Sequence, residues 1–227
     1  MPAFSRIMTL PQSFRTSDLL RLSQDAAFGH LQELGLGGVA EKLGYVWVIT
    51  RVRGEILNPP DRTLRVETWP GKTRLGMMPR YCDMYNEDGT LAVRLLTVWV
   101  LADFRTRQMV QDPAVCVPDM TRGGEMPSPR SLARKLMPRV GGFMPAPGQI
   151  DGNGHMNNAA YLDAAEDSLP FPPRALSAFA VDYRAEILPG TQVTVYATEQ
   201  ENCVFLSGSC GEKEHFRMQL TYGEVAS

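Results

Sequence analysis

The residues best suited to chemistry lie in one short loop between positions 151 and 158. Its polar members are Asp151, Asn153, His155, Asn157 and Asn158. Two intervening glycines permit a tight, irregular backbone, and the apolar residues that follow predict a helix capped by an asparagine. The first N–H groups of a helix have no intrahelical partner, and the helix dipole is positive there. The loop is therefore typical of a site that stabilises developing negative charge.

The plan of this region occurs twice in the chain. The matching segments are 26–28 with 159–161, 53–57 with 184–188, and Thr68 with Thr198, at nearly constant spacing. One match alone could be coincidence, but three in register predict two α+β halves, each a helix followed by an antiparallel sheet. Glu55 and Glu186 occupy equivalent strand positions, yet only Glu186 shares its half with the polar loop. We therefore expect one active half and one half that shapes a pocket.

Composition excludes several classes of protein. The 227 residues are 44% hydrophobic and 21% charged, as in an ordinary globular protein. A net charge of −2 gives no overall attraction to nucleic acid or membrane. The four cysteines show no CxxC spacing, which favours buried thiols over a disulfide framework or a metal site. We expect no cofactor, no metal and a cytoplasmic location, although a mature form that has lost a plastid transit peptide would look the same.

The remaining elements must position the loop. Apolar residues at helical spacing predict a helix over 19–34. Strands are predicted at 44–53, 64–68, 78–85, 91–102, 178–187, 191–199, 203–209 and 214–222. Residues 121–148 are rich in proline, glycine and basic side chains, which indicates a linker with a short helix near 129–137. The chain thus divides into an N-terminal domain at 1–120, a linker at 121–145 and a C-terminal domain at 146–227.

The polar loop also resembles a known motif. The pattern from Asp151 to Tyr161 is similar to the D-x-N-x-H-V-N-N-x-x-Y motif of fatty acyl-ACP thioesterases, and residues 182–186 resemble that family's E-Y-R-R-E strand. Segments around the three tryptophans agree as well, so that the resemblance covers residues 14–222. It implies two fused hotdog domains, each a long helix wrapped by an antiparallel sheet. The N-terminal one would hold the acyl pocket and the C-terminal one the catalytic groups.

The same resemblance implies the reaction. Family members hydrolyse the thioester that joins a fatty acid to acyl carrier protein and release the free acid. Many carry a cysteine directly after the glutamate, once proposed as a nucleophile, but here that position is Ile187. Two further departures, Met156 and Ala164, lie where valine and tryptophan are usual and could alter the shape of the pocket, so no acyl-length preference is carried over from the family.

Water is therefore the expected nucleophile. We expect Glu186 and His155 to activate or orient it, with Asp151 and Asn153 completing the network. Backbone N–H groups near Asn157 would receive the thioester oxygen. The spacing does not decide which carboxylate takes the proton.

Simpler roles stay open for these residues. His155 could only cap the helix, Asn157 and Asn158 could do the same, and Glu186 could be an ordinary charge at a strand edge. His30 and His215 lack polar neighbours in sequence, and we expect both to be structural or surface residues.

The expected partner is the acyl carrier protein, which is acidic. Four basic residues of the linker are proposed as part of its docking surface: Arg130, Arg134, Lys135 and Arg139. The alternative is an ordinary solvated linker. A homodimer is left open.

Three other functions share the expected fold. They are hydrolysis of acyl-CoA, dehydration or hydration of an acyl thioester, and binding of acyl groups without catalysis. The polar loop and Glu186 argue against the second, and release of free thiol would exclude the third.

Overall fold

The structure is a computed structural model that describes residues 3–120, 122, 126–127, 129–171 and 174–223. Its helices are α1 (Thr16–Glu33), α2 (Val39–Lys42) and α3 (Ala160–Asp167), with 3₁₀ turns η1 (Pro113–Val115) and η2 (Pro147–Gln149). The strands are β1 (Phe4–Thr9), β2 (Tyr45–Ile56), β3 (Thr63–Pro70), β4 (Met78–Tyr85), β5 (Leu91–Asp103), β6 (Met109–Val110), β7 (Arg139–Phe143), β8 (Leu176–Tyr183), β9 (Val193–Gln200), β10 (Cys203–Cys210) and β11 (Lys213–Tyr222). The protein is thus of the α+β class and rich in sheet.

These strands form one antiparallel sheet in the described part of the chain. Its order is β1-β3-β4-β5-β2-β8-β11-β10-β9-β7, with β6 paired to β5. The two halves of the chain meet where β2 pairs with β8, in a register that sets Arg51 opposite Asp182 and Gly54 opposite Phe179. A Cβ on Gly54 would lie 2.3 Å from the Phe179 ring, so only glycine lets this ring cross the junction.

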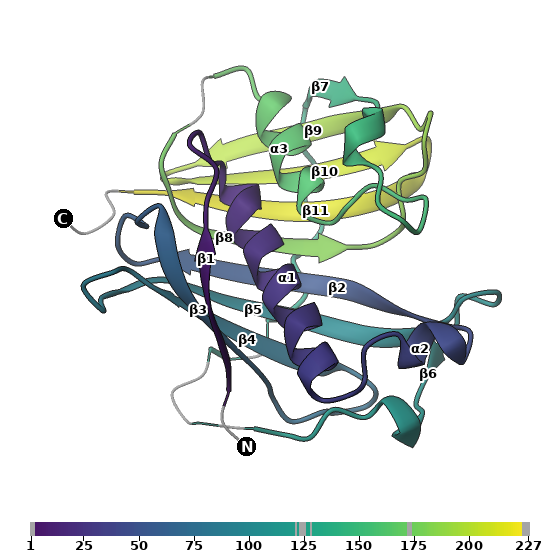
Figure 1. Cartoon of the computed structure of the whole chain (residues 1–227). Helices are drawn as coiled ribbons and strands as arrows, with labels where there is room; N and C mark the ends of the chain where they lie inside the picture. Colours follow the sequence, from purple (N-terminus) through teal and green to yellow (C-terminus); the bar gives the residue numbers. More distant parts are fainter. Residues whose placement is uncertain (1–2, 121, 123–125, 128, 172–173, 224–227) are drawn as a thin grey trace.

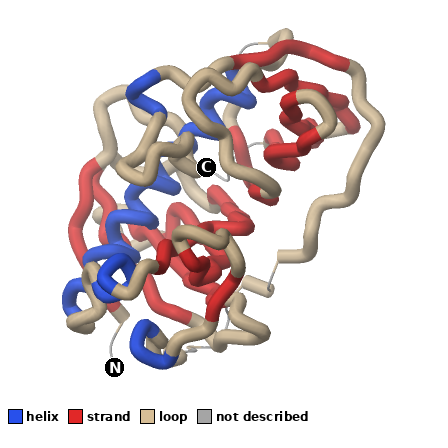
Figure 2. The backbone as a smooth tube through the Cα atoms, turned by 90° about the vertical axis from the view of Figure 1, so that its right-hand side faces the viewer, coloured by secondary structure: helices blue, strands red, loops and turns tan. Residues whose placement is uncertain are grey.

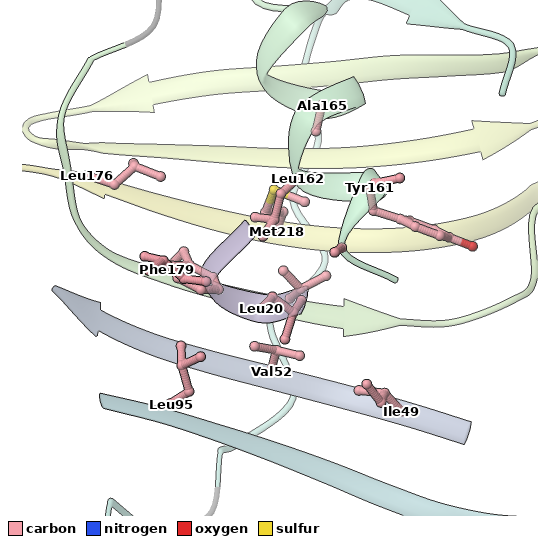
Figure 3. Close-up of a cluster of buried hydrophobic side chains, with 14 of the residues drawn as sticks. Leu20, Ile49, Val52, Leu95, Tyr161, Leu162, Ala165, Leu176, Phe179 and Met218 are labelled. Carbon is pink, nitrogen blue, oxygen red and sulfur yellow. The ribbon is translucent and has the colours of Figure 1, made fainter. Parts of the chain in front are cut away.

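The long helix α1 and the shorter α3 lie on the same face of the sheet (Figure 1). Helix α1 crosses the N-terminal strands and α3 crosses the C-terminal ones, and Figure 2 shows the loop joining the halves on the opposite side. Leu20 of α1, Val52 of β2, Leu162 of α3 and Met218 of β11 belong to one buried apolar cluster (Figure 3). Burying side chains of this size contributes about 1.5–3 kcal/mol each. The core therefore holds the two halves together.

Most predicted elements are present, but the helix predicted at 129–137 is wrong. Residues 129–138 form an irregular segment on the outer face of the sheet. The backbone N–H of Leu132 donates to Asp182 at 2.8 Å, and its carbonyl accepts from Arg217 at 2.7 Å. These groups are thereby unavailable for the i→i−4 bonds of a helix. The end of the segment predicted as a linker contains a strand, because β7 pairs there with β9.

A second difference concerns Glu186, which was predicted to lie within a strand at 178–187 but follows the end of the observed one. Strand β8 ends at Tyr183. The following segment leaves the regular ladder because the N–H of Ile187 donates to the Tyr161 hydroxyl at 3.1 Å, and its carbonyl accepts from Met156 at 2.8 Å. Glu186 is thereby drawn towards the polar loop, whereas Glu55 stays within β2.

Candidate active site

The polar loop is shaped by its own aspartate. Oδ1 of Asp151 accepts the backbone N–H groups of Asn153 at 2.8 Å and of His155 at 3.3 Å. Gly154 has a φ of +79°, a conformation that favours glycine, and its N–H donates to the Asp151 carbonyl at 3.0 Å. This turn holds the His155 backbone in place. The carboxylate of Asp151 therefore acts on the loop backbone.

Two tyrosines, the buried Tyr161 and the partly buried Tyr183, tie the loop and the helix to the segment that carries Glu186. The Tyr161 hydroxyl accepts the N–H of Ile187 at 3.1 Å, and the Tyr183 hydroxyl donates to the Asn158 carbonyl at 2.7 Å. Their rings pack edge to face, with centroids 5.1 Å apart. Burial raises the pKa of both phenols above their usual range, so both remain protonated.

The structure brings together the two side chains expected to do the chemistry. Nε2 of His155 lies 3.1 Å from Oε2 of Glu186. The carboxylate is 40% exposed, so water reaches it, while the imidazole is only 14% exposed. A neutral imidazole with its proton on Nε2 donates to this carboxylate and leaves Nδ1 as a proton acceptor.

Arg107 is a third member of this cluster and was not predicted from the sequence. Its Nη1 lies 3.2 Å from Oε1 of Glu186, and its Nη2 lies 3.4 Å from Nε2 of His155. That imidazole nitrogen cannot donate to Glu186 and accept from Arg107 at once, and the shorter contact is the one to the carboxylate. Arg107 comes from the turn between β5 and β6 and has a φ of +59°. No motif marks it, because only the fold brings this turn beside a loop 48 positions away.

The asparagines at the helix start serve different purposes. Asn157 closes the turn that leads into the helix, since its Oδ1 accepts the N–H of Ala159 at 2.9 Å, whereas α3 itself begins at Ala160 without a side-chain cap. Its own N–H donates to Gln149 at 2.8 Å and is not available to a substrate. Among the described residues, no acceptor pairs with the N–H of Asn158, which lines the cleft. The donor nearest to the predicted position is thus that of Asn158.

Asn153 lies at the edge of the same cleft. It is exposed, and within the described part of the chain its side chain makes no hydrogen bond to His155 or Glu186. Of the four residues predicted to form the site, the structure therefore pairs two directly and places one in the loop framework and one at the rim.

The cleft has a volume of about 540 Å³ and is lined by both halves of the chain. Residues 46–50 of β2 form its N-terminal wall, and the loop, α3 and residues 183–188 form the other. Trp47 also lines a narrower apolar pocket of about 30 Å³ between α1 and the sheet. Ala27, Phe28 and Leu31 of α1 and Trp99 of β5 line this pocket too.

The basic residues at 130–135 lie on the other face of the sheet, and Arg139 begins the edge strand β7. Arg130, Arg134 and Arg139 are exposed, whereas Lys135 places its ammonium 3.1 Å from the centre of the Phe205 ring. Arg184 connects the two regions: it lines the cleft, and its Nη1 lies 3.4 Å from the Ser131 hydroxyl.

Comparison with known proteins assigns the chain to a family. Residues 9–115 match the model of the acyl-ACP thioesterase N-terminal domain, and residues 141–222 match that of its C-terminal domain. The chain belongs to the acyl-ACP thioesterase family.

Solved structures support the same assignment at the level of the fold. An acyl-ACP thioesterase from Bacteroides thetaiotaomicron superposes with a TM-score of 0.83 at 20% identity, covering 97% of this chain and 98% of that one. A 12:0-ACP thioesterase from Umbellularia californica gives a TM-score of 0.78 at 20% identity, with 96% of each chain covered.

Curated relatives match over a shorter part of their length. A chloroplastic dodecanoyl-[acyl-carrier-protein] hydrolase from Cinnamomum camphora is 25% identical over 193 residues, which are 72% of this chain and 49% of the relative. A chloroplastic oleoyl-acyl carrier protein thioesterase 2 from Arabidopsis thaliana is 25% identical over 197 residues, 74% of this chain and 53% of the relative. The chain thus spans about half the length of the curated relatives it matches. No helix in the described ranges has both the length and the apolar character of a membrane crossing.

Proposed function

We propose that this protein hydrolyses the thioester between a fatty acyl group and acyl carrier protein and releases the free fatty acid. The observation that carries the proposal is the 3.1 Å contact between His155 and Glu186 at a cleft formed by both halves. We further propose that the halves are two hotdog domains, since each lays a helix across its own part of the antiparallel sheet.

In the proposed mechanism, a water molecule attacks the thioester carbonyl carbon. Glu186 takes a proton from this water, and His155 holds the carboxylate through its Nε2–H. General base assistance of this kind is worth about 10²–10⁴-fold. Arg107 fixes the other carboxylate oxygen. The C–S bond then breaks, and the departing thiolate receives the proton.

The carbonyl oxygen becomes negative during the attack. The N–H of Asn158, at the positive end of α3, is the proposed donor to it, and one such donor is worth about 10²–10³-fold. Asp151 supports the site indirectly by holding the loop, and Asn153 borders the entering substrate. Ile187 is fully buried and carries no nucleophile, which favours water over a covalent intermediate.

The apolar pocket beside Trp47 is the proposed site of the acyl chain. The pocket lies where the acyl chain of the substrate would enter on passing from the cleft into the N-terminal half. Because the pocket is narrow, side chains such as the half-exposed Phe28 must move aside when the chain binds. Each buried methylene contributes about 0.8 kcal/mol.

The carrier protein is proposed to dock beside the cleft and along the basic linker. Arg184 extends from the cleft towards Ser131, and Arg130, Arg134 and Arg139 continue the positive charge. Lys135 adds less, because its ammonium packs on Phe205. Charge reversal of the three arginines should raise KM and reduce its dependence on salt, with kcat unchanged. An unchanged KM would remove this docking surface.

The experiment that tests the function measures free thiol released from acyl-ACPs of different chain lengths, with Glu186→Ala as the inactive control. The same chains on CoA form a parallel arm. Faster turnover of the CoA series would favour an acyl-CoA thioesterase. Binding without thiol release would leave an acyl-binding module, and a dehydrated or hydrated thioester product would indicate a lyase.

A further inference from the structure

A buried arginine faces the apolar pocket from the N-terminal half. Arg80 lies on β4, whose inward side also carries Cys82 and Met84. Only 6% of Arg80 is exposed, and it lines the pocket beside Trp47 and Trp99. It is the one charged residue in a lining that is otherwise almost entirely apolar.

The protein supplies this guanidinium with two neutral partners. Nη1 of Arg80 lies 3.2 Å from Nδ1 of His30 and 3.4 Å from Oγ1 of Thr68. These two contacts use both hydrogens of Nη1. Since the guanidinium has no lone pair to offer, His30 must accept and is neutral. Burial, together with the charge of Arg80, lowers the pKa of His30 to about 4, in agreement with this role.

The other nitrogens of Arg80 have no acceptor within the described chain. No hydrogen bond joins Nε or Nη2 to a protein atom, and no carboxylate lies within ion-pair distance. The buried acid closest in sequence, Asp83, is paired with Arg94 at 3.1 Å. Neither nitrogen is among the fully enclosed polar atoms without a partner, and Arg80 is part of the pocket lining.

An unpaired buried charge opposes folding, and apolar groups of the same size would fill this position more favourably. The bonds to His30 and Thr68 account for Nη1 alone, and the Trp99 indole finds its acceptor in Thr97 at 2.7 Å without Arg80. An acceptor supplied by a ligand would satisfy the free N–H groups. An unsubstituted hydrocarbon chain offers none.

We propose that Arg80 binds an oxygen atom carried by the acyl chain, so that the preferred substrates are oxygen-bearing acyl thioesters and not unsubstituted ones. The proposal rests on the thioesterase function proposed above. The shared chemistry is a hydrogen-bond acceptor on the chain: a hydroxyl, a ketone or a carboxylate. A chain without one leaves the guanidinium desolvated and unpaired, which is the condition under which a binding site discriminates strongly.

The test compares kcat/KM for acyl-ACPs of equal length that are unsubstituted, hydroxylated, oxidised to a ketone or terminated by a carboxylate. For the wild-type protein we expect at least one oxygen-bearing chain to exceed the unsubstituted one by roughly 10- to 100-fold. The most favoured chain identifies the oxygen type. In Arg80→Met, a similar side chain without charge, this ratio should fall towards one while the unsubstituted chain is still cleaved. Arg80→Lys should retain part of the preference.

Two outcomes separate this inference from the thioesterase proposal. Equal cleavage of all four chains by the wild-type protein would overturn the role of Arg80 and leave the thioesterase intact. No thiol release from any chain would overturn both.

A second measurement needs no variant, in case Arg80→Met does not fold. The thermal midpoint of the wild-type protein is recorded with the corresponding free acids at equal concentration. An oxygen-bearing acid should raise the midpoint more than the unsubstituted acid of equal length. Equal shifts for all of them would count against the inference.

Discussion

The two halves of the molecule use the same elements for different ends. In the N-terminal half, α1 runs unbroken from Thr16 to Glu33. In the C-terminal half, α3 begins only at Ala160, and the polar loop takes the place of the preceding turns. A shorter helix frees backbone and side chains that a longer one would have bound into its own hydrogen bonds. The comparison shows how one plan gives a pocket wall in one half and a reactive loop in the other.

The glutamates and histidines of the halves differ in the same way. Glu55 stays in β2 and pairs with its neighbour Arg53 at 3.1 Å. Glu186 leaves the sheet and meets His155 and Arg107. His30 lies against a buried cation, whereas His155 lies against a carboxylate. Position in the repeat is therefore less informative than the partner that the fold supplies.

The largest expected difference between the halves is at the glutamates. Glu186→Gln keeps the size of the side chain but removes the base, so kcat for thiol release should fall by about 10²–10⁴-fold. Glu55→Gln is the matched control and should keep the wild-type rate. Similar rates for the two variants would refute the different roles proposed for the two glutamates.

A slightly smaller loss is expected at the loop histidine. His155→Ala removes the donor that holds the Glu186 carboxylate, and kcat should fall by about 10²–10³-fold. The urea midpoint of unfolding should stay close to that of the wild-type protein, because the side chain is at the cleft and not in the core. Full activity in this variant would refute the role of His155.

His30, the histidine of the N-terminal half, should affect how stable the fold is in acid and should not affect catalysis. The folded protein lowers the pKa of His30 from 6.5 to about 4, so the unfolded chain binds its proton more readily. The stabilisation that the folded state gains from a neutral His30 is fully present above pH 6.5. It is lost as the pH falls to about 4, which lowers the free energy of unfolding by at most about 3 kcal/mol.

His30→Gln keeps an acceptor for Arg80 but does not titrate. Its free energy of unfolding, measured in urea at pH 7 and pH 4.5, should fall less on acidification than that of the wild-type protein. Parallel pH dependence in both proteins would contradict the buried, neutral state of His30.

The smallest effect is expected at the arginines beside the two glutamates. Arg107→Met removes one of the contacts that orient Glu186, and kcat should fall by about tenfold, since Arg107 is partly exposed and its charge is screened. Arg53→Met, beside Glu55, should leave the kinetics unchanged. Equal behaviour of Arg107→Met and Arg53→Met would show that Arg107 only borders the site.

Much of the fold was predictable because its signals are local. Alternating apolar residues gave β2, β3, β4 and β5 to within a few positions, and helical spacing gave α1. The helix predicted at 129–137 failed because its backbone groups bond to Asp182 and Arg217 of distant strands. Those partners carry no local signal.

Short stretches of the chain were enough to predict most of the elements, the polar loop and the family resemblance, because backbone propensity, periodicity and motif spacing are local properties. Tertiary structure alone decided which side chains meet. It brought Arg107 to Glu186, moved Glu186 off its strand and left Arg80 facing an apolar pocket without a carboxylate. These contacts depend on how β2 and β8 pair and how the loops pack. Non-local packing of this kind is set by the burial of the whole core and not by any single segment.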